Sequence, residues 1–205
     1  MSRVLDGSPA SEGMGTGRVR VVDWAVPRVP HEMVEAEEVE AEVERFHRAR
    51  ERVRERLEEL KVGTEARLGP VEARIFDPQI LMLQDVEVVD GTVRYIRENR
   101  LTAARAFDWR MMELQTLWTR TSHPFLLDRL NDLEDLQVRL LNELLGQSDP
   151  FAVHTEDGPV VIVARNVTPS MTVQLDPAVV AGIATDQGTR TSHWAILARS
   201  QGIPA

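Results

Sequence analysis

One histidine near the end of this sequence follows a cluster of residues that suit phosphate chemistry. In the segment "DQGTRTSH", Gly188 gives the backbone freedom, and Arg190 supplies a guanidinium whose planar donors match phosphate oxygens. Three hydroxyl side chains complete the segment: Thr189, Thr191 and Ser192. A glycine-containing loop that leads into a helix presents backbone N–H groups and the positive end of the helix dipole to an anion. Residues 186–192 are therefore a candidate phosphate loop.

His193 is the side chain beside this loop that can react. A neutral imidazole nitrogen can attack a phosphoryl group, and the ordinary pKa of histidine keeps that neutral form available near pH 7. The alternative is that His193 only caps or packs the helix, because most histidines outside metal clusters have no catalytic role. The residue types alone leave both alternatives open.

Strands are predicted before this loop and near the amino terminus. The runs "PVVIVA" (159–164) and "VVAGIAT" (179–185) are continuously apolar, which is typical of strands buried on both faces. Near the amino terminus, Val19 and Val21 alternate with arginines in "GRVRVVDW", a period that predicts another strand.

Two short helices are predicted, one before and one after the strand at 179–185. Thr168 and Pro169 suit the N-cap and the first position of a helix in "TPSMTVQL". The segment "SHWAILARSQG" predicts a helix that is closed by Gly202 and Pro204.

A helical block fills the middle of the sequence, from about residue 31 to residue 146. Its first, long helix is amphipathic, with apolar side chains on a 4-3 spacing: Val39, Val43, Phe46, Val53, Leu57 and Leu60. Gly63 and the Gly69-Pro70 pair are predicted to interrupt the segment after these residues. Further helices are predicted at about 71–83, 86–99, 103–120 and 124–145, with Thr102 as one N-cap and Gly146 as the last stop. Aromatic and methionine side chains in this block are expected in its core.

The order of these elements predicts the fold class. Strands lie at both ends of the sequence and helices lie between them, which indicates a mixed α+β or α/β protein. The simplest arrangement is a discontinuous α/β domain formed by residues 1–30 and 147–205, with an all-α helical-hairpin domain inserted over residues 31–146.

Composition limits the partners and the location. Asp and Glu outnumber Lys and Arg by 33 to 24, a formal net charge of −9, which disfavours nucleic acid as a partner. The acidic balance suits a basic protein partner, or serves solubility alone. With no cysteine, disulfides and Cys-based zinc sites are excluded, and the histidine spacing predicts no metal site. No apolar run approaches about 18 residues, so we expect no membrane span and a cytoplasmic location.

Several segments resemble the phosphoenolpyruvate-utilising enzymes. The final stretch "TDQGTRTSHWAILARSQGIPA" closely resembles their phosphohistidine segment, and its Thr-Ser-His form is similar to enzyme I of the bacterial sugar phosphotransferase system. "ASEGMGTGRVRV" resembles the glycine-rich amino-terminal strand region of enzyme I. "RIFDPQILMLQD" and "DRLNDLEDLQVRLLNELLG" are similar to segments of its helical domain, and "VIVARNVTPSMTVQL" to the segment before its active loop. The resemblance spans essentially the whole chain.

The resemblance implies roles for particular residues. His193 would accept phosphate from phosphoenolpyruvate and pass it to a histidine of the carrier protein HPr. The Thr168 hydroxyl would hydrogen-bond the resting His193, and Arg190 would assist catalysis. The helical domain would bind HPr through a surface with these predicted members: Leu81, Met82, Glu87, Trp118, Leu126 and Arg129.

In enzyme I, phosphoenolpyruvate and Mg²⁺ bind in a carboxy-terminal (β/α)8 barrel that also forms the dimer. We therefore expect this chain to be the amino-terminal part of such an enzyme and to bind no cofactor itself, with Mg²⁺ needed by the full-length protein. Its partners would be HPr and its own carboxy-terminal domain. The chain alone is not expected to phosphorylate itself from phosphoenolpyruvate.

Three features depart from the enzyme I pattern. Thr189 stands where the loop has a second glycine, and Trp194 stands where a small residue follows the histidine. Trp194 would either narrow the pocket or stack on a partner. An acidic patch is thinner, because Pro70 and Val71 occupy positions that are commonly acidic, although Glu87 remains. Two alternatives stay open: an enzyme I-like module of a dihydroxyacetone kinase phosphoryl-donor subunit, or a regulatory docking protein without phosphoryl transfer.

Overall fold

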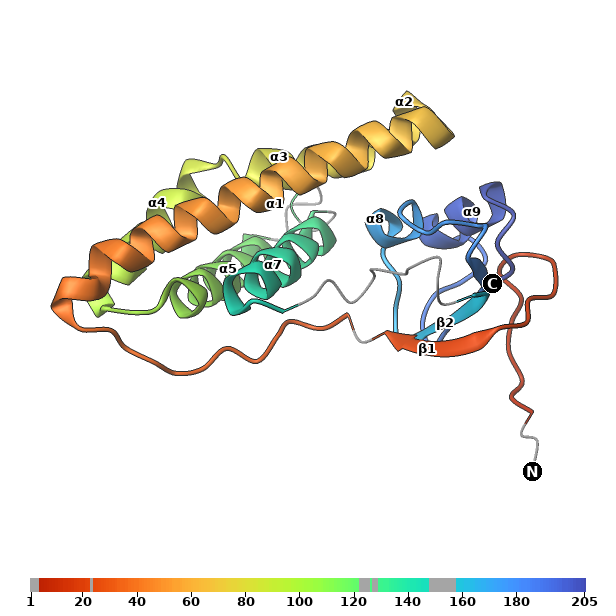
Figure 1. Ribbon diagram of the computed structural model, residues 1–205, viewed down its shortest axis with the longest axis horizontal. Coiled ribbons are helices and arrows are strands. Elements are labelled where there is room, and N and C mark those ends of the chain that lie inside the picture. The colour runs from red at the N-terminus through yellow and green to blue at the C-terminus, as the bar shows by residue number, and fades with distance from the viewer. Residues whose placement is uncertain (1–3, 23, 122–125, 127–128, 148–157) are drawn as a thin grey trace. The chain divides into compact units, whose positions relative to one another are not determined.

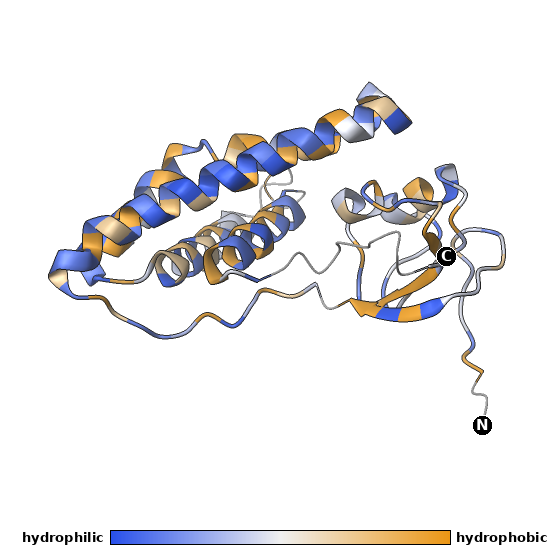
Figure 2. Cartoon of the chain, in the orientation of Figure 1, coloured by the Kyte–Doolittle hydropathy of each residue, from blue (hydrophilic) through white to orange (hydrophobic). Residues whose placement is uncertain are grey.

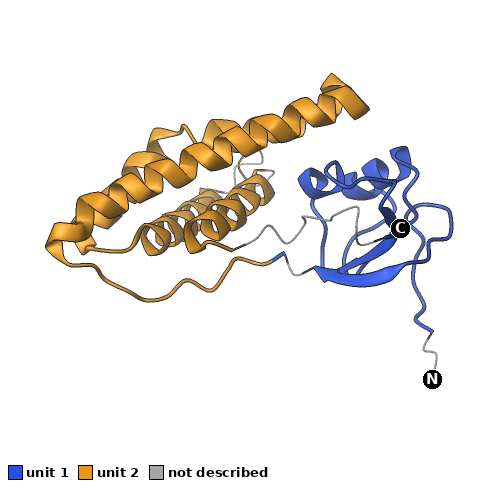
Figure 3. Cartoon of the chain, viewed as in Figure 1, with its two compact units in different colours: residues 1–24, 150–205 blue, residues 25–149 orange. Residues whose placement is uncertain are grey.

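The protein divides into two compact units, shown in Figure 1 and coloured separately in Figure 3. The computed structural model describes residues 4–22, 24–121, 126, 129–147 and 158–205. The α/β unit combines residues 1–24 with 150–205, and the helical unit consists of residues 25–149. Both ends of the sequence thus build one unit, and the helical unit is an insertion in it. This confirms the predicted fold class.

The α/β unit contains a parallel sheet of three strands in the order β1-β2-β3. The strands are β1 (Arg18–Val22), β2 (Val160–Ala164) and β3 (Val180–Thr185), in positions close to those predicted. In the register, Arg18 of β1 pairs with Val160 of β2. The glycine-rich approach to β1 has a steric reason, because a Cβ on Gly15 would overlap the carbonyl oxygen of Ala181.

Two helices cover one face of this sheet and contribute side chains to the apolar core there. They are α8 (Pro169–Thr172) and α9 (His193–Ser200), which pack against each other. Ile162 and Ile183 are buried in the core that these helices complete. Val19 and Val21 of β1, by contrast, are 67% and 74% exposed, and alternate residues of β2 are only half-buried. The alternation predicted for β1 is therefore present, whereas the prediction that β2 and β3 are buried on both faces is wrong, because the described helices cover one face only.

The long helix α1 is amphipathic, as the alternating polar and apolar colours along it show in Figure 2. The core includes Phe46, Phe107, Met111 and Leu133, each 0% exposed, as expected of these aromatic and methionine side chains. The expectation is wrong for Trp109 and Met112, which are 39% and 55% exposed. The main helices are α1 (Val39–Leu68), α2 (Pro70–Ala73), α3 (Asp77–Met82), α4 (Val86–Asn99), α5 (Ala103–Thr121) and α7 (Leu130–Leu145).

Local sequence signals set several of the helix ends. The backbone N–H of Arg105 donates to the Thr102 hydroxyl at 3.3 Å, as expected of an N-cap, and Gly146 ends α7 with φ of +65°. Gly63 does not interrupt α1, contrary to prediction, because a lone glycine costs a helix only about 1 kcal/mol. The helix instead stops at Gly69, whose φ is +105°. Residues 124–125 and 127–128 of the helix predicted at 124–145 lie outside the described residues.

None of the described helices combines the length and apolar character needed to cross a bilayer.

Candidate functional site

The phosphate loop connects β3 to α9 at the carboxyl end of the sheet. Its first residues are fixed to the end of β2, because the N–H of Asp186 donates to the carbonyl of Ala164 at 3.3 Å. The N–H of Gln187 likewise donates to the carbonyl of Arg165 at 3.1 Å. Open α/β sheets bind ligands at this edge, outside the carboxyl ends of the strands. The fold therefore places the loop where anion binding is common.

A network of hydroxyl groups closes the loop on itself. The N–H of Thr189 donates to Ser192 Oγ at 2.9 Å, and the N–H of Ser192 donates back to the Thr189 carbonyl at 3.0 Å. Thr189 Oγ1 also lies 3.0 Å from Thr191 Oγ1. Thr189 needs no glycine, because the positive φ of +120° belongs to Gly188 and Arg100 is the only non-glycine residue with positive φ in the described part of the chain.

The first turn of α9 lacks a side-chain cap. Ser192 is the N-cap residue, with extended φ and ψ of −61° and 142°, but its side chain makes no capping hydrogen bond. Its hydroxyl is turned toward the Thr189 N–H instead. His193 is the first residue of the helix and is exposed. The positive end of the helix therefore lies beside an accessible imidazole and keeps its uncapped first-turn N–H groups for an anion.

Arg190 is exposed, and its backbone is fastened by a second arginine. Arg199, in the last turn of α9, donates from Nη2 to the Arg190 carbonyl at 3.1 Å. The same nitrogen donates to the carbonyl of Ala10 at 2.6 Å. Sequence reasoning missed Arg199, because nothing local indicates that a residue at the end of the helix returns to the loop at its beginning.

Thr168 is the N-cap of α8, as predicted. Its backbone is extended, its hydroxyl accepts from the N–H of Met171, and Thr168 Oγ1 lies 3.1 Å from Ser170 Oγ. The helix that it begins packs against α9, and Gln201 Nε2 donates to the carbonyl of Thr172 at 3.0 Å. The expected hydrogen bond from Thr168 to His193 stays a prediction.

Trp194 lies in the core of the α/β unit, where its side chain is 6% exposed. It also lines a cavity of about 650 Å³ together with Gly188, Thr189 and Arg190. Of the two expectations for this residue, stacking on a partner is wrong, because the buried indole offers no exposed face.

A groove in the helical unit collects the residues predicted to bind a partner. Its volume is about 630 Å³, and its lining includes all six of them: Leu81, Met82, Glu87, Trp118, Leu126 and Arg129. Sequence reasoning missed the other lining residues, among them Leu114 and Leu117. The spacing of Leu114 and Leu117, which lie three residues apart and share a helix face with Trp118, could have indicated them. Leu81 and Leu117 are 66% and 54% exposed, so the groove is apolar and open.

Two acidic side chains at the rim of this groove are paired with basic side chains of the same chain. Arg110 Nη2 lies 2.6 Å from Glu87 Oε2, and Lys61 Nζ lies 2.6 Å from Asp77 Oδ1. Asp85 accepts a hydrogen bond from the N–H of Glu87 and thereby caps α4. The Val71 side chain is 73% exposed, where the family pattern leads us to expect an acid.

Arg129 pairs with a neighbour beside the same groove. Its Nη1 lies 3.0 Å from Asp132 Oδ2, and burial raises the pKa of the Asp132 carboxyl above its usual range despite this contact. Within the described residues, no three histidine, aspartate or glutamate side chains gather as metal ligands would.

Comparison with known proteins agrees with this geometry. The model of the amino-terminal domain of the PEP-utilising enzymes matches residues 6–129, and the model of their mobile domain matches residues 156–205. Phosphoenolpyruvate-protein phosphotransferases of Listeria monocytogenes and Geobacillus stearothermophilus are 33% and 34% identical over 205 residues, which cover 100% and 99% of this chain. The chain spans 35% of the length of each relative.

Solved structures show the same architecture. An NMR solution structure of Enzyme I has a TM-score of 0.80 and 32% identity, over 98% of this chain and 81% of that one. The N-terminal domain of Enzyme 1 - Nitrogen shares the fold at 21% identity, with a TM-score of 0.69 over 96% of this chain and 79% of that one. The chain, with its inserted helical unit and its histidine at the start of α9, belongs to the family of phosphoenolpyruvate-utilising enzymes.

Proposed function

We propose that this chain carries a phosphoryl group on His193 and forms the amino-terminal part of a phosphoenolpyruvate-protein phosphotransferase. The observation that carries the proposal is the exposed imidazole at the first residue of α9, beside uncapped N–H groups and a loop that contains Arg190. The similarity to phosphotransferases over the whole chain supports the same conclusion.

The transfer step needs a neutral imidazole. The unprotonated ring nitrogen of His193 attacks phosphorus with its lone pair, and the N–P bond forms as the bond from phosphorus to the donor breaks. The electron pair of that bond leaves with the donor, which is an enolate oxygen in phosphoenolpyruvate or a histidine nitrogen in a phosphorylated carrier. The first-turn N–H groups of α9 and the Arg190 guanidinium stabilise the negative charge of the transferring oxygens. A hydrogen bond from Thr168 would orient the ring.

The groove of the helical unit is the proposed docking site for the protein that receives the phosphoryl group. Its centre, around Leu81, Leu117 and Trp118, is apolar, and such a surface suits an apolar patch on the partner. We propose HPr, the small phosphocarrier protein of the sugar phosphotransferase system, as this partner. Phosphoenolpyruvate and the Mg²⁺ that assists it would bind in the rest of the full-length enzyme.

Transfer of label tests the proposal directly. The chain is incubated with phosphocarrier protein labelled with radioactive phosphate on its histidine, and acid-labile label on the chain is measured. We expect label on the wild-type chain and none on His193→Ala, whose circular dichroism and melting temperature should match the wild type because residue 193 is exposed.

Two outcomes would contradict the proposal. Label that persists on His193→Ala would assign the phosphoryl group to another residue. Carrier binding without any label on the wild-type chain would indicate a docking protein that does not transfer phosphate. A substitution in the groove, Leu81→Asp, should weaken binding of the carrier and leave the maximal rate of phosphoryl transfer unchanged.

A further inference from the structure

Trp194 is packed directly against the phosphate loop. A Cβ placed on Gly188 would lie 2.7 Å from Nε1 and 2.8 Å from Cζ2 of the indole. These distances are shorter than ordinary contacts, so the loop backbone can approach the indole this closely only because residue 188 has no side chain. The rest of the indole is held in the apolar core, beside Ala195 and Ala198.

The loop transmits this contact to the reactive histidine. Gly188 is followed by Thr189, whose N–H is bonded to Ser192 Oγ and whose carbonyl accepts from the Ser192 N–H. Ser192 directly precedes His193 and is the N-cap of its helix. A displacement of Gly188 would therefore move the closed turn 189–192 and, through it, the start of α9.

The side chains of the first two residues of α9 point in different directions. His193 is exposed, and Trp194, the next residue, is buried, as the rotation of about 100° per residue in a helix allows. One turn of helix thus presents the reacting ring to solvent and the supporting ring to the underside of the loop.

We propose that Trp194 is a positioning residue for phosphoryl transfer: its indole edge seats Gly188 and so fixes the phosphate loop beside His193. This inference rests on the proposed function, since it names what holds that site in shape. It also gives a structural reason for a tryptophan where the family pattern has a small residue.

Two substitutions disturb the contact from its two sides. Trp194→Phe keeps much of the apolar volume in the core but withdraws the indole edge from Gly188. Gly188→Ala introduces a methyl group that would press against the indole, at a backbone φ of +120° that alanine also strains. Gly202→Ala is the control for an added methyl group in open space, because Gly202 has a positive φ of +70° in the same unit but nothing within 4 Å of its added Cβ. Trp194→Phe leaves the Gly188 backbone unchanged and therefore tests the indole contact itself.

The rate of label transfer from phosphorylated carrier should separate positioning from docking. We expect Trp194→Phe and Gly188→Ala to lower the maximal rate by about ten- to a hundredfold, since small misplacements of reacting groups have effects of this size. The half-saturating carrier concentration should not change, because the docking groove lies in the helical unit. Gly202→Ala should transfer at nearly the wild-type rate.

Amide hydrogen exchange at Thr189 provides a readout that needs no transfer. Its N–H is bonded to Ser192 Oγ, so exchange should become faster in Trp194→Phe while amides of β2 keep their wild-type rates. If the wild-type chain takes no label, the proposed function fails, and exchange alone then decides whether Trp194 seats the loop. Unchanged exchange, or faster exchange with a wild-type transfer rate, would overturn the positioning role.

Discussion

The guanidinium of Arg199 binds the backbone carbonyl of Arg190, so the end of α9 holds the loop that leads into its beginning. The distance is 3.1 Å, and the same Nη2 atom also reaches the carbonyl of Ala10 at 2.6 Å. A single side chain thus joins the amino-terminal segment, the phosphate loop and α9. Because both acceptors are backbone carbonyls, the contact fixes the path of the chain and leaves the Arg190 side chain available for an anion.

Replacing Arg199 by alanine should loosen the loop without unfolding the unit. Trypsin cleavage after Arg190 requires the loop to open, and its rate, followed by mass spectrometry, should rise about five- to tenfold if roughly 1 kcal/mol of hydrogen bonding is lost. Arg18→Ala, an exposed arginine on β1 at the other edge of the sheet, is the control and should leave this cleavage unchanged. Equal cleavage rates in all three proteins would refute the role of Arg199.

Replacing Leu81 by aspartate should impair docking and spare the chemistry. Leu81 lines the groove and is 66% exposed, so the substitution should change stability by less than about 0.5 kcal/mol. The half-saturating concentration of phosphorylated carrier should rise at least about tenfold, which corresponds to about 1.4 kcal/mol, while the maximal rate of labelling stays unchanged. Val62→Asp, at a 68% exposed valine outside the groove lining, should behave like the wild type. Similar effects of both variants would mean that the carrier docks elsewhere.

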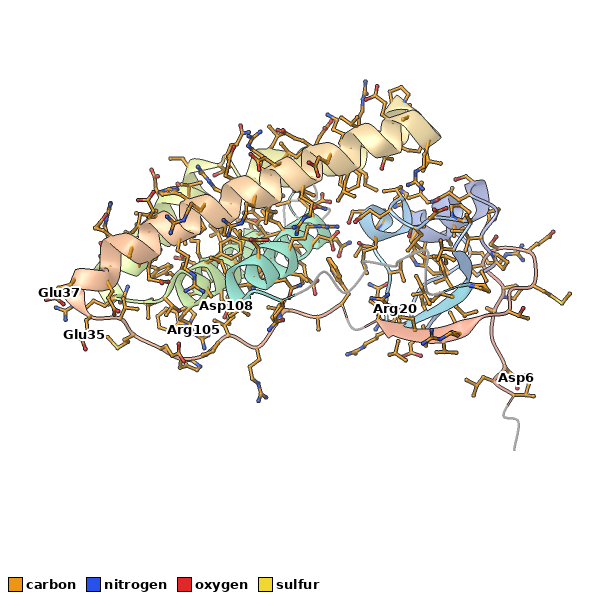
Figure 4. All side chains as sticks on the ribbon, viewed as in Figure 1. Asp6, Arg20, Glu35, Glu37, Arg105 and Asp108 are labelled. Atoms are coloured by element: carbon orange, nitrogen blue, oxygen red, sulfur yellow. The ribbon has the colours of Figure 1, made fainter. Side chains whose placement is uncertain are left out.

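Removing the Asp108 carboxylate should strongly destabilise the helical unit. Arg105 and Asp108, both on α5 and labelled in Figure 4, form an ion pair at 3.1 Å with side chains only 7% and 10% exposed. Gln137 Nε2 donates to the same carboxylate at 2.9 Å, and Arg105 also donates to the Val29 carbonyl at 2.6 Å. Asp108→Ala would leave a buried arginine without its counter-charge, at a cost of about 3 kcal/mol.

Urea unfolding followed by circular dichroism measures this cost. The control is Glu40→Ala, which breaks an ion pair with Arg97 whose side chains are 68% and 52% exposed. That variant should lose far less stability than Asp108→Ala, because water screens exposed pairs. If Asp108→Ala lost no more free energy of unfolding than Glu40→Ala, burial would not explain the strength of the Arg105–Asp108 pair.

Acidification should destabilise the helical unit through His47. Burial, and then the positive charge of Arg50, lowers the pKa of His47 below its ordinary 6.5. The unfolded chain therefore takes up a proton at higher pH than the folded chain does. The resulting contribution to stability is complete above pH 6.5 and is lost as the pH falls through the lower folded pKa.

His47→Gln should lack this part of the pH dependence. Urea midpoints measured between about pH 7.5 and pH 5, a range that spans the ordinary histidine pKa, should fall less steeply for the variant than for the wild type. Parallel profiles for the two proteins would show that His47 does not couple protonation to folding.

The sequence predicted those parts of the fold that depend on local patterns. The 4-3 spacing of Val43, Phe46 and Val53 is the signature of a helix with one buried face, and all three are buried in α1. The caps at Thr102 and Gly146 depend on the chemistry of one turn, so neighbouring residues were enough to indicate them. The resemblance to the family indicated the groove residues and His193, whose roles in docking and transfer stay predictions.

Long-range packing decided what the sequence could not. Alternation identified β1 as a strand, but only the assembled sheet shows that Val19 and Val21 lie on its open side. Nothing local indicates that the Trp194 indole meets Gly188, because that contact depends on how the intervening loop turns back. The burial of Arg110 is a similar case: it pairs with Glu87 of the neighbouring helix α4, and Gly91 leaves the space that its guanidinium fills.

The discontinuous α/β unit has a consequence for the order of events during synthesis. β1 leaves the ribosome early, whereas its partner β2 emerges only after the whole helical unit has been made. The helical unit is continuous in sequence and can fold through contacts within its own segment. Until β2 arrives, β1 is an unpaired strand, and its alternating Arg18 and Arg20 discourage pairing with other nascent chains. The two arginines of this short strand therefore oppose pairing with other chains while the polypeptide is still being made.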